Sequence, residues 1–274
     1  MPCVGLPTVR RARGGLTPVR PATSSQAHNT SFHREVNVLN PTQQDVDQYF
    51  ERGYAILPEA LNGDELAVLS SVCDELLQEP PDDDQGGKAH NIGKGQDRRF
   101  LRHRHQDKAA LSGFVLGQGM RTMISPFIGA TPHLFNEQFV VKGPKTGAAF
   151  AWHQDSGYVG FDHAPYLSVW IAIDDTTADN GPVFVMPRNL REDTSIEDHQ
   201  WDAEGKEMVG YQGSDPGIPA IVPAGSVVLF SSVTLHRSSP NTTDHSRRAY
   251  LAQYSEAPLL DPATGAPKTF AVPL

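Results

Sequence analysis

The pattern that most limits the fold begins at Leu134, where the chain becomes a series of short β-rich runs separated by turn residues. Asn180-Gly181 and Pro223-Ala224-Gly225 supply turn chemistry between these runs. Glycine (24 residues) and proline (22 residues) are abundant, which favours many turns over long helices. Six or more strands after two or three helices predict a mostly β protein with flanking α-helices, built as an antiparallel barrel or jelly roll. The strands are expected at residues 138–142, 149–153, 167–173, 182–186, 226–231 and 247–254.

Two helices are expected before these strands. Thr42 is a suitable N-cap for a short helix that ends at Gly53. Asn62 followed by Glu65 resembles a capping box and opens a second helix, in which helical spacing places Cys73 in the core.

Three further segments complete the chain. Residues 79–107 are polar and rich in glycine, aspartate and arginine, which is typical of a mobile surface loop. A third helix is expected at about residues 108–128. The polar, acidic insert between Arg188 and Pro219 contains Trp201 and Tyr211. Its position between strands is compatible with a lid at the barrel mouth and with a tolerated surface insertion.

The length of 274 residues suits one domain. We expect this domain over residues 35–274, with the barrel core at about 134–256. Residues 1–34 form a basic leader without an acidic residue, and we expect it to be disordered. An organelle transit peptide is the alternative for this leader, because it is rich in arginine and lacks acids.

Charge, hydropathy and cysteine usage exclude several classes. The net charge of −9 gives no support for nucleic-acid binding. No stretch of 18 apolar residues exists, so no transmembrane helix is expected. Cys3 and Cys73 are not expected to pair, and a reducing, cytoplasmic compartment is the default expectation. The sequence leaves the oligomeric state open.

One pair of motifs carries the chemistry. His153-Gln154-Asp155 lies at the end of a predicted strand, where side chains alternate, so His153 and Asp155 share a face and Gln154 takes the other. A distal histidine, His236, follows the apolar run 227–230, which is typical of a buried strand. Two imidazoles and one carboxylate match the facial set that binds Fe(II) and leaves coordination positions open.

A second His-x-Asp sequence, His105-Gln106-Asp107, weakens the motif taken alone. It lies in a run of arginine and histidine before a predicted helix, where Asp107 is interpreted as an N-cap and the histidines as a solvated basic patch. For this patch and for Arg98 and Arg99, an acidic substrate group is the alternative partner.

Arg247 opens the last predicted strand. A hairpin over the preceding loop would bring Arg247 beside His236 and Ser238. There its guanidinium would hold the far carboxylate of an iron-bound keto acid in a bidentate pair. Taken alone, His236 could be a core histidine and Arg247 part of an ion pair; their combination favours the iron site. Arg248 is expected on the opposite face as a solvated charge.

Further motifs are specific as a combination: His153-Gln154-Asp155, Trp170 with Ile171-Ala172-Ile173-Asp174-Asp175, Asn180-Gly181-Pro182, Pro223-Ala224-Gly225-Ser226, and His236-x-Ser238 with Arg247. From about Thr42 to Tyr254 the chain resembles the phytanoyl-CoA dioxygenase family. The resemblance implies a double-stranded β-helix fold, of the jelly-roll or cupin-like kind, with Fe(II), 2-oxoglutarate and O2. It also implies that Ser238 and Arg247 bind the far carboxylate of 2-oxoglutarate.

The resemblance extends to three further residues and fails at one loop. Asn136 and Lys142 lie on the strand where family members contact the keto acid, and Trp170 matches an aromatic residue near the iron. By themselves these three are equally well interpreted as a strand-end polar residue, a surface lysine and a core tryptophan. Pro187-Arg188-Asn189-Leu190 stands where many relatives have Pro-Gly-Ser-His. That loop borders the substrate in the family, so no substrate identity is transferred.

The expected activity is oxidation of an unactivated carbon of a small metabolite, with release of succinate and CO2 from 2-oxoglutarate. Asp155 favours hydroxylation over halogenation, because related halogenases have a small residue there. Epimerisation, desaturation and ring closure stay open. Two alternatives remain: a catalytically silent metal- and 2-oxoglutarate-binding barrel that acts as a sensor or interaction module, and a jelly-roll hydrolase or isomerase with another metal. A small-molecule substrate is the expected partner, with neither nucleic acid nor membrane.

Overall fold

The computed structural model describes residues 40–80, 88–92, 98–145 and 147–274. These residues belong to one compact unit, Asn37–Leu274. The basic leader at residues 1–34 lies outside the described residues, so its disorder and the domain boundary stay predictions. Among the described residues, no helix is both long enough and apolar enough to cross a membrane.

Both predicted N-terminal helices form with the predicted caps. Helix α1 (Gln43–Arg52) has Thr42 as its N-cap and closes on Gly53, which adopts the left-handed conformation with φ 77°. Helix α2 (Gly63–Leu77) begins after Asn62, whose side chain takes part in a capping box.

The third predicted helix is instead two helices, α3 (Ala109–Val115) and α4 (Gln118–Ile128). Gly117 separates them and is the N-cap of α4, with an extended backbone (φ −76°, ψ 164°). A Cβ atom at Gly117 would lie 2.3 Å from the carbonyl oxygen of Gly113. The close approach of the two helices therefore requires glycine at the junction.

The prediction of a surface loop at residues 79–107 is wrong over much of that segment. Strands β2 (Ala89–Ile92) and β3 (Arg98–Arg102) form there, followed by the 3-10 turn η1 (Arg104–Gln106). Strand β3 pairs over its whole length with β4 (His133–Lys142). Backbone pairing with a long neighbouring strand orders β3 in spite of its polar composition.

The remaining strands form one large sheet, one smaller sheet and a hairpin, all antiparallel. The large sheet has the order β1-β11-β6-β13-β4-β3-β2, with β14 paired to β4; its further members are β1 (Tyr54–Leu57), β6 (Leu167–Ala172), β11 (Val227–Ser231), β13 (Arg247–Ser255) and β14 (Val272–Pro273). The smaller sheet has the order β10-β7-β12-β5, formed by β5 (Phe150–His153), β7 (Val183–Val185), β10 (Ile218–Pro219) and β12 (His236–Ser238). The hairpin joins β8 (Gln200–Asp202) and β9 (Glu207–Val209). These sheets confirm the predicted mostly β, jelly-roll architecture.

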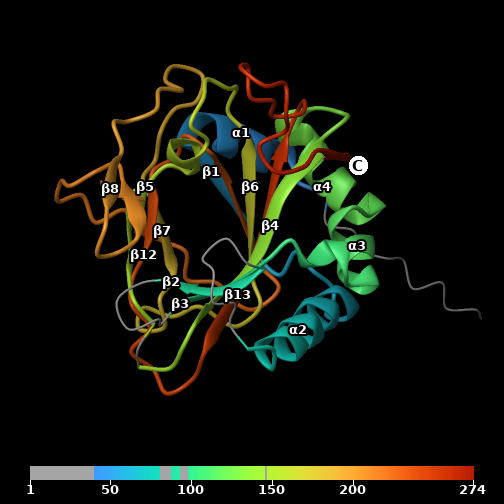
Figure 1. The fold of residues 1–274 in the computed structure, drawn as a ribbon, viewed down its shortest axis with the longest axis vertical. Coiled ribbons are helices and arrows are strands. Elements are labelled where there is room, and N and C mark those ends of the chain that lie inside the picture. Colours follow the sequence, from blue (N-terminus) through green and yellow to red (C-terminus); the bar gives the residue numbers. More distant parts are fainter. Residues whose placement is uncertain (1–39, 81–87, 93–97, 146) are drawn as a thin grey trace, which may run out of the picture. The chain divides into compact units, whose positions relative to one another are not determined.

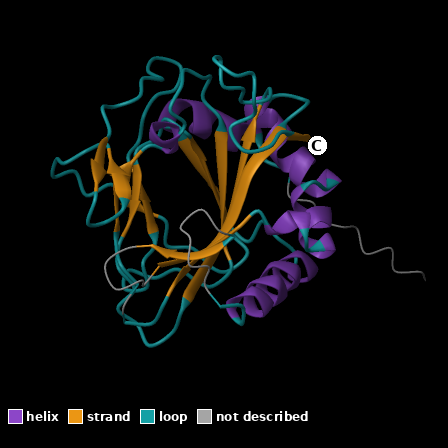
Figure 2. Cartoon of the chain, in the orientation of Figure 1, coloured by secondary structure: helices purple, strands orange, loops and turns teal. Residues whose placement is uncertain are grey.

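The large sheet lies between the smaller sheet on one side and helices α2 to α4 on the other (Figures 1 and 2). Its strands alternate faces, so successive residues enter different cores. On β6, Val169 and Ile171 pack in the helix-side core, together with the buried Cys73 of α2. Trp170 and Ala172 pack in the core between the sheets. The face between the sheets also carries polar side chains, among them Gln138, Gln253 and Arg247.

The loop between β12 and β13 is held by one buried side chain. The Nδ2 atom of Asn241 donates to the carbonyl oxygens of Lys142, Gly143 and His245, at 3.2, 3.0 and 2.8 Å. Asn241 is fully buried, and its Oδ1 accepts from the hydroxyl of Thr243 at 2.7 Å. This side chain therefore fixes the path of the chain into Arg247.

We expect Asn241→Ala to lower the free energy of unfolding by about 2–4 kcal/mol, because several buried carbonyl oxygens lose their donor. Urea denaturation measures this loss. The control is Thr242→Ala, whose exposed hydroxyl bonds only to the carbonyl oxygen of Asp179 and which should cost less than about 1 kcal/mol. Equal effects of the two substitutions would contradict the role given to Asn241.

Candidate metal centre

Two histidines lie opposite each other in the smaller sheet. His153 is the last residue of β5 and His236 is the first of β12, and they are register partners in the antiparallel pair. Their ring centroids are 4.2 Å apart. Pairing of two strands that are distant in the sequence therefore brings the two imidazoles together.

Asp155 lies beside the two histidines, but it is not on the strand where it was predicted. Strand β5 ends at His153, and Asp155 opens the 3-10 turn η2 (Asp155–Tyr158). Gln154 between them keeps an extended backbone (φ −107°, ψ 138°), so the alternation of faces continues through it. Its side chain points away and donates to the carbonyl oxygen of Val233 at 2.6 Å.

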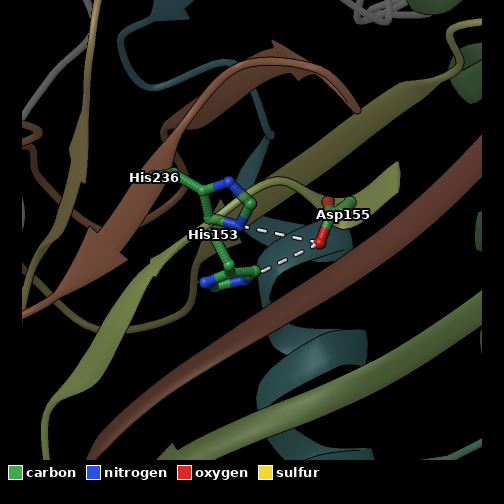
Figure 3. A group of neighbouring side chains, drawn as sticks. All are labelled: His153, Asp155 and His236. Carbon is green, nitrogen blue, oxygen red and sulfur yellow. Dashed lines mark ion pairs between the residues drawn. The ribbon is translucent and has the colours of Figure 1, made fainter. Parts of the chain in front are cut away.

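The three side chains converge in the geometry of a metal site (Figure 3). Oδ1 of Asp155 lies 3.9 Å from Nε2 of His153 and 3.6 Å from Nε2 of His236. All three residues are buried, and their ligand atoms lie within 4.8 Å of one another. Nδ1 of each histidine contacts a main-chain carbonyl oxygen, that of Ala151 at 2.8 Å and that of Thr234 at 3.1 Å. Because a carbonyl only accepts, Nδ1 carries the proton and Nε2 is free to bind a metal.

The electrostatic setting favours metal binding as well. Burial, with a further contribution from the neighbouring His236, holds the pKa of His153 well below its usual range. The neutral imidazole is the form that binds a metal. Two imidazoles and one carboxylate fit Fe(II) and leave its other coordination positions open.

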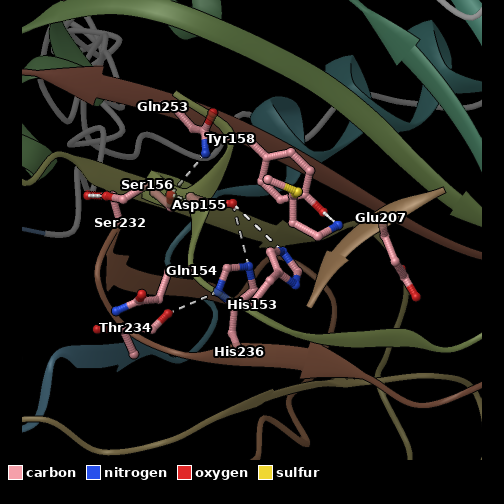
Figure 4. A network of polar contacts seen from close by, with 12 residues as sticks. His153, Gln154, Asp155, Ser156, Tyr158, Glu207, Ser232, Thr234, His236 and Gln253 are labelled. Carbon is pink, nitrogen blue, oxygen red and sulfur yellow. Dashed lines mark hydrogen bonds and ion pairs between the residues drawn. The ribbon is translucent and has the colours of Figure 1, made fainter. Parts of the chain in front are cut away.

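A chain of hydrogen bonds from the large sheet anchors Asp155 (Figure 4). The hydroxyl of Ser168 donates to Oδ2 of Asp155 at 2.5 Å. Nε2 of Gln253 donates to that hydroxyl at 3.2 Å, and Nδ2 of Asn136 donates to Oε1 of Gln253 at 2.7 Å. Oδ2 is thus occupied, and Oδ1, which faces the histidines, remains for a metal.

The centre borders a cavity of about 470 Å³ between the two sheets. Aromatic side chains form much of its wall: Phe100, Phe150, Tyr158, Trp170 and Phe230. Such a wall keeps water away from a bound molecule.

Arg247 lines the same cavity from the first residue of β13. Arg247 is 2% exposed, and within the described part of the chain its Nε and Nη1 atoms have no hydrogen-bond partner. Burial lowers its pKa to about 10, so it remains charged at neutral pH. A buried guanidinium with free donors is a position for an anion.

Of the other predicted ligands of 2-oxoglutarate, three line the cavity, and Lys142 is not among the lining residues. Ser238 and Trp170 line it, and the ring of Trp170 lies 5.6 Å from the Arg247 guanidinium carbon. Asn136 lines it at the Asp155 end, within the chain of hydrogen bonds above. Lys142 is the register partner of Arg247, is 1% exposed, and donates to the carbonyl oxygen of Ser239. Contacts of these side chains with 2-oxoglutarate stay predictions.

Comparison with known proteins identifies the family. The family model described as phytanoyl-CoA dioxygenase matches residues 49–249. The chain belongs to this family. The predicted resemblance is therefore confirmed.

The chain is similar to several curated proteins and solved structures. A phytanoyl-CoA dioxygenase domain-containing protein 1 homolog of Caenorhabditis briggsae is 30% identical over 46% of this chain and 47% of its own length. The ectoine dioxygenase of Stutzerimonas stutzeri is 24% identical, with 83% and 80% of the two chains covered. Among solved structures, EvdO2 of Micromonospora carbonacea var. aurantiaca, complexed with 2-oxoglutarate, superposes with a TM-score of 0.65 at 23% identity over 83% and 96% of the two chains. The chain spans about half the length of the first curated relatives that it matches.

The hairpin predicted between His236 and Arg247 does not form in this member of the phytanoyl-CoA dioxygenase family. Strand β12 belongs to the smaller sheet, whereas β13 pairs with β4 and β6 of the large sheet. The loop between them crosses from one sheet to the other. His236, Ser238 and Arg247 still line one cavity, because they face each other across the sandwich rather than along a ladder.

The second His-x-Asp sequence is not a solvated patch. His105 is buried, and its Nδ1 lies 3.0 Å from Oε1 of Glu137 on the helix-side face of β4. Asp107 is not an N-cap either, because α3 begins after Lys108. Its carboxylate instead pairs with Arg104 at 3.1 Å. Hydrogen bonds to the buried Glu137 hold His105 in the interior. The spacing of residues in the sequence does not indicate this contact.

Two further charges expected in solvent form ion pairs. Arg98 is buried and pairs with Glu207 of the insert at 2.7 Å. Arg248 lies on the helix-side face, as its alternation predicted, but pairs there with Asp174 at 2.6 Å. Both predictions of solvated charge are wrong because a partner arrives from a segment distant in the sequence.

The insert between Arg188 and Pro219 forms part of the cavity wall. It contains the β8–β9 hairpin, and Trp201 and Lys206 of this hairpin line the cavity. Trp201 is nevertheless 58% exposed, which places it at the mouth. The insert is therefore more than a surface insertion, and its movement as a lid stays a prediction.

Several residues of the cavity and the metal centre escaped the sequence analysis. Three of them lie an even number of residues from a predicted ligand on the same strand: Ser168 from Trp170, Gln138 from Asn136, and Gln253 from Arg247. Because strand side chains alternate, this spacing would have indicated the shared face. Arg102 offered no such signal, because its strand was taken for a loop. Arg102, Gln138 and Gln253 belong to the polar part of the wall. Ser168 is not a lining residue and bonds to Asp155.

We expect Ser168→Ala to weaken Fe(II) binding by roughly 10- to 100-fold, since Asp155 loses the donor that orients it. Calorimetric titration with Fe(II) under argon measures this change. The control is Ser156→Ala, another buried serine, which bonds to Ser232 and not to Asp155. Unchanged affinity in folded Ser168→Ala would refute the anchoring role.

The lowered pKa of Lys142 predicts how the free energy of unfolding depends on pH. Burial, followed by repulsion from Arg247, lowers its pKa to about 6 from 10.5. Between these values the unfolded chain binds one more proton than the folded chain, so the free energy of unfolding rises with pH by up to about 1.4 kcal/mol per unit. Relative to Lys142→Met, which lacks the group, the wild type should therefore gain stability from pH 6 to pH 9.

Urea denaturation of both proteins across this pH range measures the gain. The exposed Lys145, in an ion pair with Asp244, provides the control Lys145→Met. A constant difference between wild type and Lys142→Met from pH 6 to pH 9 would mean that the pKa of Lys142 is ordinary.

Proposed function

We propose that this chain is an Fe(II)- and 2-oxoglutarate-dependent dioxygenase that hydroxylates an unactivated carbon of a small metabolite and releases succinate and CO2. The observation that carries the proposal is one cavity with two features: the buried His153, Asp155 and His236 set, and the buried, unpaired guanidinium of Arg247. The named activity of the related ectoine dioxygenase, which matches over most of its length, supports the same reaction class.

The residues divide the work between the metal and the co-substrate. His153, Asp155 and His236 would hold Fe(II) through two Nε2 atoms and Oδ1. When bound, iron with 2-oxoglutarate and O2 supplies the oxidising chemistry, which no side chain of the protein can provide. The carboxylate of Asp155 would occupy a coordination position on the metal, which favours hydroxylation over halogenation.

Arg247 would bind the far carboxylate of 2-oxoglutarate. Its Nε and Nη1 have no hydrogen-bond partner among the described residues. The planar guanidinium fork matches the two oxygens of a carboxylate. Ser238 on β12 would add a hydroxyl donor from the opposite sheet. The aromatic wall would exclude water, which strengthens these charge-assisted hydrogen bonds.

An anaerobic titration with Fe(II) and then 2-oxoglutarate tests the proposal. Intact protein should develop the visible metal-to-ligand charge-transfer band, and His153→Ala should not. Asp155→Ala should lose substrate hydroxylation. Arg247→Gln should still bind Fe(II), but its affinity for 2-oxoglutarate should fall by roughly 10- to 100-fold, because charge-assisted hydrogen bonds are worth about 1.5–3 kcal/mol.

Arg121 of α4 is partly buried and does not line the cavity. It provides a charge-matched control, Arg121→Gln, which should bind 2-oxoglutarate as the wild type does. Absence of the band in folded wild-type protein would remove the dioxygenase assignment and leave the silent barrel. A band of equal intensity in His153→Ala would show that the metal binds elsewhere.

A further inference from the structure

Seven of the arginines among the described residues form two contrasting groups. One group lies within 2.8 Å of a carboxylate oxygen: Arg98, Arg104, Arg188 and Arg248. The other group lines the cavity and has no carboxylate partner in the part of the chain that the structure describes: Arg102, Arg237 and Arg247. Three arginines that no carboxylate of the described chain neutralises therefore line this one cavity.

Arg102 differs from the other two cavity arginines. Arg247 has a place in the proposed binding of 2-oxoglutarate. Arg237 stacks on the ring of Phe184 at 3.8 Å and donates to the carbonyl oxygen of Pro216 at 3.0 Å. Arg102 donates from Nε to Oε1 of Gln138 at 3.1 Å, and neither of its Nη atoms has a hydrogen-bond partner among the described residues. Its terminal donors are thus unused, while Gln138 holds the base of the guanidinium in place.

The register of the large sheet separates Arg102 from Arg247. Arg102 is opposite Gln138, which is opposite Leu251 of β13. Arg247 lies four residues along β13 from Leu251, which is about 13 Å of extended chain, and β13 is two strand spacings, about 10 Å, from β3. One small dicarboxylate held by Arg247 therefore leaves Arg102 to a different molecule.

The charges of the cavity wall point in the same direction. Asp155 is the carboxylate among the described lining residues, and it belongs to the metal centre. Lys206 and Lys268 add positive charge to that of the three arginines. Lys268 donates to the carbonyl oxygens of Tyr158 and Val159, and no carboxylate of the described chain neutralises it. In a cavity with apolar walls, this excess attracts and orients an anion.

We propose that Arg102, positioned by Gln138, binds an oxyanion of the substrate, so that the substrate is a small anionic metabolite. The oxyanion is a carboxylate, a phosphonate or a phosphate, each of which matches the guanidinium fork. The rest of the substrate lies against the aromatic wall beside the metal centre. This inference rests on the proposed function and names the substrate class of the same site.

Binding of small oxyanions tests the inference without the substrate. The probes are methylphosphonate, inorganic phosphate and acetate, with uncharged dimethyl methylphosphonate for comparison. They are titrated under argon into full-length protein loaded with Fe(II) and saturated with 2-oxoglutarate, which keeps the Arg247 position filled. Changes in the NMR signals of the probes and in the charge-transfer band report binding.

We expect saturable binding of at least one oxyanion probe to wild-type protein, and none of dimethyl methylphosphonate. Arg102→Gln should weaken oxyanion binding by about tenfold or more, since a charge-assisted pair is lost. Gln138→Glu should weaken it similarly, because the new carboxylate pairs with Arg102 from within. Arg121→Gln, which removes the same charge from α4, should bind as the wild type does.

The relative order of the probes distinguishes a carboxylate substrate from a phosphorus oxyanion. No oxyanion binding to wild-type protein that shows the charge-transfer band would overturn the inference, as would unchanged binding in Arg102→Gln. A missing band in wild-type protein would instead overturn the proposed function. Arg102-dependent oxyanion binding in the absence of the band would preserve the anion site.

Discussion

The antiparallel pairing of β5 with β12 is the interaction on which the centre depends. It places His153 opposite His236, although more than eighty residues separate them in the chain. Each imidazole is then oriented by a hydrogen bond from Nδ1 to the carbonyl oxygen two residues before it, Ala151 or Thr234. A shift of one residue in this register would turn one imidazole to the opposite face, because strand side chains alternate.

The large sheet supports this centre from across the cavity. Its helix-side face supplies most of the apolar core and carries the polar Glu137 and Arg248 in paired positions. Its cavity face carries Ser168, Gln253 and Arg247 among apolar neighbours. The separation is possible because helices cover one face and the smaller sheet covers the other (Figure 1). Buried polar groups are costly when unpaired, so their concentration on one face marks the face that meets ligands.

The division of arginines between paired and unpaired positions follows the same logic. Arg98 and Arg248 are neutralised by Glu207 and Asp174 and contribute to the structure of the domain. Arg102 and Arg247 face the cavity, and no carboxylate in the described ranges pairs with either of them. An unpaired charge in a cavity is tolerated where a ligand of opposite charge binds to it. Here two such positions, far apart on the sheet, remain for anionic ligands.

Much of the fold and of the metal set was determined by the sequence alone. Caps at Thr42 and Asn62, turns such as Asn180-Gly181 and the alternation of apolar residues act locally, so the helices and strands can be read without the fold. The identities of His153, Asp155, His236 and Arg247 likewise follow from motifs at fixed spacing. Tertiary structure alone decided that β12 and β13 lie in different sheets, that β3 is a strand and that Arg102 meets the cavity. Each of these depends on pairing between segments far apart in the chain, and no local pattern encodes which partner a strand or a charge will find.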